Sequence, residues 1–160
     1  MRLAAAGGLL LTAASPPPAP HQFDIVGFFT GRTRTENILK VALHRPVPLD
    51  VDSVGGKGDR GDFVLIDTVH EGDKPLRTRK WVMHEVGPGH FAGLLTDAIS
   101  PVDMSVSGNA ATVRYTMKGG LDVFQTMTLQ ADGRTLTNKV VAKRFGIAFA
   151  HVEGTIRKLD

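Results

Sequence analysis

Five residues stand out as groups with which this chain could bind another molecule. Arg79 comes two residues before Trp81, the only tryptophan of the chain. The other three, Asp97, Tyr115 and Asn138, lie in later segments. A guanidinium binds anionic groups or stacks on an indole, and a carboxylate, phenol or amide orients a polar ligand through hydrogen bonds. We therefore take these five as candidate ligand-binding residues.

The candidates also have structural explanations. Arg79 and Trp81 alternate onto one face of a strand, where stacking of guanidinium on indole contributes about 1 kcal/mol without any ligand. Asp97 beside a barrel arginine would form either a buried ion pair that fixes the strand register or the polar end of a pocket. For both pairs, the structural role is the simpler expectation.

The patterns that catalysis or metal binding requires are missing from the sequence. The chain has no cysteine, so it has no disulfide, no thiol nucleophile and no cysteine-ligated metal. No Gly-x-Ser-x-Gly elbow is present, and the segment 55–58 lacks the Gly-Lys-Ser/Thr ending of a phosphate loop. The six histidines have no i, i+2 or i, i+4 pair. We expect no catalytic residue, no metal and no cofactor.

Size and charge exclude further classes of protein. A chain of 160 residues with 42% hydrophobic residues is long enough for one domain with a core of its own. The formal charge of +3 comes with no basic block, which argues against a nucleic-acid binder. The 18 glycines and nine prolines indicate many turns between short elements.

The first 22 residues predict export. Residues 1–14 have a basic start, an apolar run and small residues at the end, which is the pattern of a signal peptide. Residues 15–22 hold four prolines and form a stiff tether before a single domain over residues 23–160. The apolar run is too short to span a bilayer, and no later segment is long and apolar enough. We expect a periplasmic or secreted bacterial protein.

The rest of the chain predicts an all-β fold. Segments rich in Val, Ile, Thr, Leu and aromatic residues alternate with Gly-, Asp- and Pro-containing turns, as in a sandwich or a barrel. Short turns favour antiparallel neighbours. The predicted strands are 31–43, 47–53, 62–70, 76–86, 89–95, 101–107, 109–117, 122–130, 135–143 and 147–158.

Alternation within these strands assigns inner faces. Residues 77, 79, 81 and 83 share one face, which predicts that Trp81 is buried. Leu136, Val140 and Ala142 point inward, so Asn138 does too, and its desolvated amide needs a partner, for which Tyr115 or Arg79 is the expected one. Residues 23–29 are too apolar for the surface and predict a helical turn that plugs one end.

Several segments together resemble an uncharacterised bacterial family of exported, often lipid-anchored proteins, domain-of-unknown-function family 3833. The resemblance spans nearly all of residues 24–159 and implies a closed antiparallel up-and-down barrel of the lipocalin-like (calycin) kind, with about eight to ten strands and no established activity. The segments that carry it are Phe28-Phe29-Thr30-Gly31-Arg32-Thr33, Asp62-Phe63-Val64-Leu65, Glu71-Gly72, Arg79-Lys80-Trp81, Ala92-Gly93, Asp97-Ala98, Gly108-Asn109-Ala110, Arg114-Tyr115, Asn138 and Phe145-Gly146.

The chain departs from that family at three points. Many relatives have a lipobox cysteine at the signal cleavage site, and this chain has no cysteine, so we expect no lipid anchor. The acidic and aromatic stretch of the first long strand is replaced by residues 38–43, and the late aromatic motif by residues 124–129. Because of the last two changes, the resemblance does not imply that the interior, or any ligand, is shared with the relatives.

Three functions fit the sequence. The first is an envelope barrel that binds a small apolar or amphipathic molecule, with Arg79, Tyr115 and Asn138 orienting its polar head. The second is a barrel enzyme that uses Asp97 with Arg79 for acid–base chemistry. The third is a structural or assembly factor with a packed barrel. An internal cavity of a few hundred Å³ would favour the first.

Overall fold

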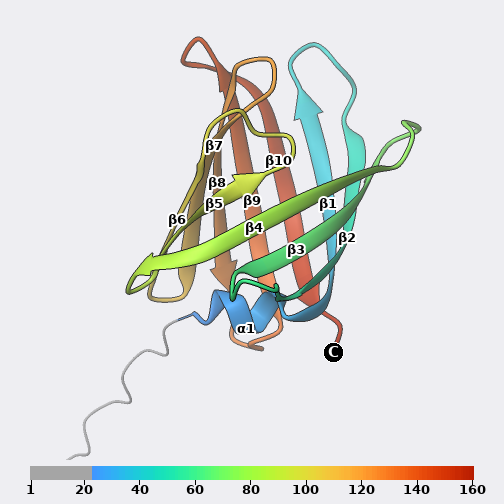
Figure 1. Cartoon of the computed structure of the whole chain (residues 1–160). Helices are drawn as coiled ribbons and strands as arrows, with labels where there is room; N and C mark the ends of the chain where they lie inside the picture. The colour runs from blue at the N-terminus through green and yellow to red at the C-terminus, as the bar shows by residue number, and fades with distance from the viewer. Residues whose placement is uncertain (1–22) are drawn as a thin grey trace, which may run out of the picture.

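Ten antiparallel strands follow one another around a closed barrel in the computed structural model, which describes residues 23–160 (Figure 1). Each strand pairs with its neighbours in the sequence, and β1 pairs with β10 to close the sheet. The strands are β1 (Gly31–Val41), β2 (Val47–Lys57), β3 (Phe63–Glu71), β4 (Arg77–Gly87), β5 (His90–Leu95), β6 (Val102–Ser107), β7 (Ala110–Met117), β8 (Leu121–Leu129), β9 (Thr135–Arg144) and β10 (Ile147–Lys158).

The expected all-β class, the barrel closure and the strand number are confirmed. The predicted signal peptide 1–14 and tether 15–22 lie outside the described residues. No helix among residues 23–160 is long and apolar enough to cross a membrane.

One end of the barrel is closed by the helix α1 (Ile25–Phe29), as the sequence predicts (Figure 1). Asp24 caps the helix by accepting a hydrogen bond from the backbone N–H of Gly27 at 2.9 Å. The rings of Phe23 and Phe28 pack edge to face at 5.8 Å, and those of Phe28 and Phe29 at 5.1 Å. All three rings are buried, so hydrophobic burial holds this floor in place.

The strand β2 is longer than predicted, because residues 55–57 continue it instead of starting a turn. The helix α1 packs against this part of the strand. A Cβ atom on Gly55 would lie 2.1 Å from the backbone carbonyl oxygen of Phe29, so only glycine lets α1 approach this strand. The sequence pattern Gly-Gly, which elsewhere marks a hairpin tip, marks a close backbone contact here.

The inner faces follow the alternation that the sequence predicts. On β9, Leu136 and Asn138 are buried, and Lys139 and Lys143 are exposed. On β4, Met83 is buried, and the three preceding residues on its face also point to the barrel interior. The side-chain period of two therefore sets which groups reach the interior.

Candidate functional site

The barrel interior contains a cavity of about 430 Å³. Its floor is formed by Ile25, Val26 and Phe29 of the α1 end, and its walls are mainly aliphatic and aromatic side chains. The cavity extends to the opposite end of the barrel, where Leu39 and Leu49 line it. A packed barrel would leave no such space, and cavities of this size hold small molecules. The packed-barrel alternative is therefore not supported.

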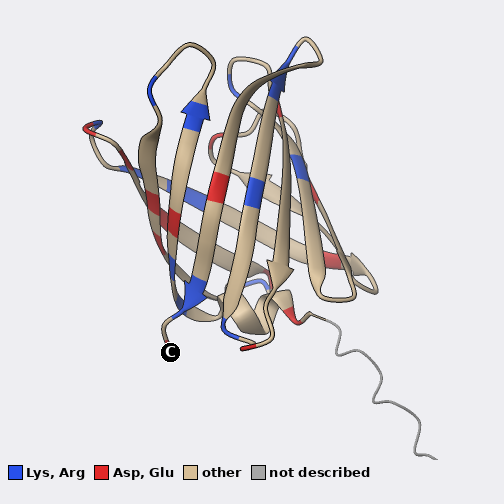
Figure 2. Ribbon diagram, turned by 180° about the vertical axis from the view of Figure 1, so that it is seen from behind, with Lys and Arg blue, Asp and Glu red and all other residues tan. Residues whose placement is uncertain are grey.

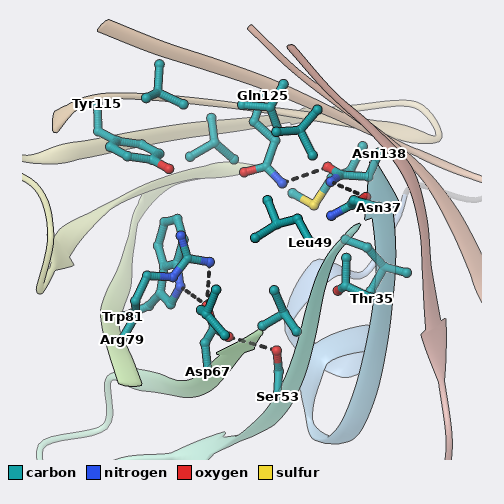
Figure 3. Close-up of a pocket in the computed structure, with 18 of the residues that line it drawn as sticks. Thr35, Asn37, Leu49, Ser53, Asp67, Arg79, Trp81, Tyr115, Gln125 and Asn138 are labelled. Atoms are coloured by element: carbon teal, nitrogen blue, oxygen red, sulfur yellow. Dashed lines mark hydrogen bonds and ion pairs between the residues drawn. The ribbon is translucent and has the colours of Figure 1, made fainter. Parts of the chain in front are cut away.

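Asp67 of β3 is the centre of the first polar cluster in this cavity (Figure 3). Its carboxylate accepts hydrogen bonds from Ser53 Oγ at 2.7 Å, Trp81 Nε1 at 2.8 Å and Arg79 Nη2 at 2.9 Å. The registers of β2 with β3 and of β3 with β4 place Ser53, Asp67 and Arg79 side by side. The side chain of Asp67 is only 4% exposed, so these three donors replace the water that it loses.

Arg79 keeps hydrogen-bonding capacity after it has bonded to Asp67. Its Nε–H is buried and has no partner among the described residues, although buried donors are rarely left unpaired. The guanidinium carbon lies 5.7 Å from the ring centroid of Trp81, so the predicted stacking is present as well. Arg79 thus has a structural role, and its side chain also lines the cavity.

Trp81 and Tyr115 form the aromatic wall beside this cluster. Their rings meet edge to face with centroids 5.7 Å apart. Trp81 is half-buried and packs against the core, so its predicted inner-face position is correct. Tyr115 is buried, and its hydroxyl points into the cavity in Figure 3. Burial raises the pKa of the Tyr115 phenol, an effect that the charge of Arg79 opposes, so the hydroxyl stays protonated at neutral pH.

Asn138 belongs to a second polar cluster on the opposite side of the cavity (Figure 3). Its Oδ1 accepts a hydrogen bond from Gln125 Nε2 at 2.8 Å, and its Nδ2 donates to Asn37 Oδ1 at 3.3 Å. The inner position of Asn138 is as predicted, but the expected partners Tyr115 and Arg79 are wrong. The register pairs β9 with β8 and β10, so the nearest polar groups come from that side of the barrel.

Asn37 reaches this cluster beside Gly154 of β10, which lies opposite it in the strand register. A Cβ atom on Gly154 would lie 2.0 Å from the carbonyl oxygen of Glu36 and 2.4 Å from Oδ1 of Asn37. Glycine at position 154 leaves room for the Asn37 amide to turn inward toward Asn138. The buried amides of Asn37 and Asn138 and the half-buried amide of Gln125 form a chain that joins β1, β8 and β9.

Asp97 lies apart from both clusters. It accepts a hydrogen bond from Arg77 Nη1 at 2.5 Å, its side chain is 25% exposed, and it is not among the residues that line the cavity. The expected pairing of Asp97 with Arg79 is wrong, because Arg79 bonds to Asp67 instead. The structural explanation of Asp97, an ion pair at the end of β4, is the one that the geometry supports.

The sequence contained signals for the residues that were missed. Asp67 is the one charged residue in the alternating series Phe63, Leu65, Asp67 and Val69. Asn37 continues the series of Thr33 and Thr35, which are both buried. A polar side chain at a position that alternation assigns to the interior has to find partners there. The same reasoning that identified Asn138 applies to both.

No group of three or more His, Asp or Glu side chains within residues 23–160 is arranged to hold a metal ion. The carboxylate of Asp67 already accepts three hydrogen bonds, which suits a structural anchor for Arg79 and Trp81 better than proton transfer. The site has the features of a binding pocket: apolar walls with a few fixed polar groups.

The sequence from residue 17 to residue 158 matches the family model described as "Protein of unknown function (DUF3833)". The chain belongs to the DUF3833 family. The match covers every strand of the barrel, so the resemblance expected from the short motifs is confirmed. No curated protein matches the sequence.

Two solved structures share the fold of this DUF3833 protein. A protein of unknown function from the DUF3598 family of Nostoc punctiforme is 12% identical, with a TM-score of 0.64 over 91% of this chain. This chain spans 53% of that protein, about half its length. The S-type phycobiliprotein lyase of Guillardia theta is 6% identical, with a TM-score of 0.67 over 86% of this chain and 92% of the lyase. At such identities the likeness extends to the barrel fold alone.

Proposed function

We propose that this protein binds one small amphipathic molecule inside the barrel. The observation that carries the proposal is a cavity of about 430 Å³ with mainly aliphatic and aromatic walls, which the partly exposed side chain of Arg79 lines. An apolar body would contact the aliphatic walls, and burial of its surface would supply most of the affinity. A hydrogen-bond acceptor on the same molecule would bond to the guanidinium group of Arg79.

The positions of the polar groups narrow the chemistry of the ligand. Arg79 and the Tyr115 hydroxyl both face the cavity from the side of the Asp67 cluster, and both act as donors (Figure 3). A carboxylate, a sulfonate or a carbonyl oxygen matches this pair. The amide chain around Asn138 already satisfies part of its own hydrogen-bonding capacity, so it serves mainly to hold the far wall.

The test uses the fluorophore 1-anilinonaphthalene-8-sulfonate as an anionic amphipathic probe. We expect saturable binding to a single site, weakened about tenfold by Arg79→Gln, because a hydrogen bond to a charged partner contributes about 1.5–3 kcal/mol. Val140→Trp should abolish binding by filling the cavity from β9.

Arg34→Gln is the matched control. Arg34 lies on β1 outside the cavity and bonds to Asp52 at 2.8 Å, so it also loses an arginine–aspartate pair when changed. Unsaturable binding by the unaltered protein, or equal losses in Arg34→Gln and Arg79→Gln, would refute the proposal. Native mass spectrometry of protein purified from its own cells would then identify the molecule retained in the barrel.

The same proposal places the protein in the cell envelope of a bacterium, on the basis of the pattern of residues 1–14. We expect a variant that lacks residues 3–14 to stay in the cytoplasm, and the unaltered protein to be recovered outside it with a shortened N-terminus. Recovery of the unaltered protein in the cytoplasm would contradict this part of the proposal, and the binding experiment would remain valid.

A further inference from the structure

Large apolar side chains stand fully exposed on two hairpins at the open end of the barrel, opposite α1. Leu43 lies in the β1–β2 loop and has a relative exposure of 105%. Phe145 lies in the β9–β10 turn at 93%, followed by Ile147 at 74%. Single exposed apolar residues are common on proteins. Three of them on neighbouring hairpins form an apolar patch at one end of the barrel.

At the two hairpin tips the backbone conformation is unfavourable for the large side chains that occupy it. Leu43 and Phe145 are the two non-glycine residues with positive φ in the part of the chain that the structure describes, at 64° and 50°. Phe145 and Gly146 form a two-residue hairpin turn in which both residues have positive φ. Such turns favour Asn-Gly, since bulky residues are strained in this region. The phenylalanine at position 145 therefore occupies a backbone conformation that is unfavourable for it.

Cations surround the exposed side chains. Lys40, Arg45, Lys143 and Arg144 are all exposed, and the segments 40–47 and 141–150 contain no Asp or Glu, although Asp122 lies opposite Lys143 in the register of β8 with β9. In Figure 2 the ends of β1 and β9 and the loop after β1 carry blue segments. Within residues 23–160 none of these four cations forms an ion pair. Their charge is therefore available to an external partner.

Arg144 has local contacts that leave its charge uncompensated. Its Nη2 donates to the carbonyl oxygen of Gly119 at 3.3 Å, and its guanidinium lies 5.2 Å from the ring centroid of Phe149. Both partners are neutral. These contacts fix the position of the cation on the same side of the barrel as Phe145.

The two hairpins form one surface that adjoins the cavity. The strands β1 and β10 are paired, and the backbone N–H of Ala42 donates to the carbonyl oxygen of Phe149 at 3.0 Å. Phe149 and Val41 also line the cavity. We call this surface the open-end rim; it consists of Leu43, Phe145 and Ile147 with Lys40, Arg45, Lys143 and Arg144.

We propose that the open-end rim docks on the surface of an anionic lipid bilayer. Exposed apolar side chains on loop tips enter the boundary between head groups and acyl chains, and cations beside them bind anionic head groups. A second copy of the chain is a poorer partner, because two rims of the same positive charge would repel each other. Docking would set the mouth of the cavity against the bilayer. The proposal does not depend on what the cavity holds.

The test is flotation of the domain of residues 23–160 with vesicles of phosphatidylcholine plus phosphatidylglycerol, and with vesicles of phosphatidylcholine alone. We expect binding to the anionic vesicles, loss of most of it in molar salt, and little binding to the neutral ones. Phe145→Asn should weaken binding about tenfold, since it removes a buried aromatic ring from the bilayer boundary. Arg45→Gln with Lys143→Gln should weaken binding to the anionic vesicles only.

Matched controls lie at the closed end. Val86→Asn changes an apolar residue that is 61% exposed near the β4–β5 turn, and Lys57→Gln with Arg60→Gln removes two exposed cations. These controls should bind like the unaltered protein. Asparagine suits the backbone at position 145, so the melting temperature of Phe145→Asn should not fall, which separates lost binding from lost folding. Equal losses in rim and control variants, or absence of binding, would overturn the proposal. Concentration-dependent dimers that Phe145→Asn dissociates would also overturn it in favour of a self-association surface.

Discussion

The two ends of the barrel use the same residue types in opposite ways. At the closed end Phe28 is 5% exposed and packs between two other phenylalanine rings, and at the open end Phe145 is 93% exposed on a turn. Burial of the Phe28 ring stabilises the fold, whereas the exposed Phe145 ring makes no such contribution. Residues that fold the barrel and residues available to a partner are therefore separated along its axis.

Charged groups show the same contrast. At the closed end Lys158 Nζ donates to the carbonyl oxygens of Phe28 and Thr30, and Asp160 accepts from the backbone N–H of Arg32 at 2.7 Å. These bonds lower the pKa of the Asp160 carboxyl, chiefly through the backbone N–H of Arg32. The cations of the open-end rim have no such acidic partners among the described residues. Beside α1 these charges fasten the C-terminal strand to the helix, whereas the cations of the open-end rim form no ion pair among residues 23–160.

The largest expected effect tests this separation directly. Phe28→Ala should lower the free energy of unfolding by about 3–5 kcal/mol, because it removes a buried ring and leaves a cavity in the floor. Phe145→Ala at the open end should change it by less than about 0.5 kcal/mol. Denaturant unfolding of both variants measures the difference. Similar losses in the two variants would show that the ends are not distinct in this sense.

A substitution in the cavity wall, between the two ends, should lower the free energy of unfolding by an intermediate amount. Asn138→Leu leaves the buried amides of Gln125 and Asn37 without their partner, which should lower stability by about 1–3 kcal/mol. Binding of the anionic fluorophore should persist, because Arg79 lies across the cavity (Figure 3). A variant of unchanged stability that loses the fluorophore would instead make Asn138 a ligand-binding residue.

At the open end a polar substitution should be stabilising. Phe145→Asn relieves the left-handed backbone strain of a bulky residue and should raise the free energy of unfolding by about 1 kcal/mol. The same change at Leu43 should act in the same direction. A clear fall in stability would mean that the Phe145 ring makes folding contacts that its exposure does not show.

The smallest expected effect is on stability at alkaline pH, and it comes from Tyr115 in the cavity wall. The folded-state pKa of Tyr115 is raised by burial, so the neutral phenol stabilises the fold below its unfolded pKa of about 10. This stabilisation is lost as the pH rises through the folded pKa. Tyr115→Phe should remove that part of the alkaline slope. Because the chain has a single tyrosine, its absorbance titration reports this group alone, and an ordinary pKa would contradict its desolvation.

The strand order and the inner faces were accessible from the sequence, because alternation and turn residues act locally. Leu136, Asn138 and Val140 were assigned to the interior from their spacing, and the helical plug from an apolar run too dense for the surface. These inferences need no knowledge of which strands are neighbours.

The partners of the interior residues were not accessible, because they depend on register between strands. Asp67 replaced Asp97 as the partner of Arg79 because Asp67 lies opposite Arg79 in the register of β3 with β4, while Asp97 bonds to Arg77. Gln125 and Asn37 replaced Tyr115 as partners of Asn138 for the same reason. A list of inward polar residues can be read from the sequence, but their pairing needs the closed barrel.

The pairing of the first strand with the last has a consequence for how the protein folds. Until residues 147–158 are available, one edge of β1 exposes unpaired backbone groups, and the site of Asn37 next to Gly154 does not exist. The contacts that close the barrel are among the most distant in the sequence, which slows folding of such topologies to milliseconds or longer. The barrel, and with it the cavity, therefore closes only once residues 147–158 have been synthesised and are free to pair with β1.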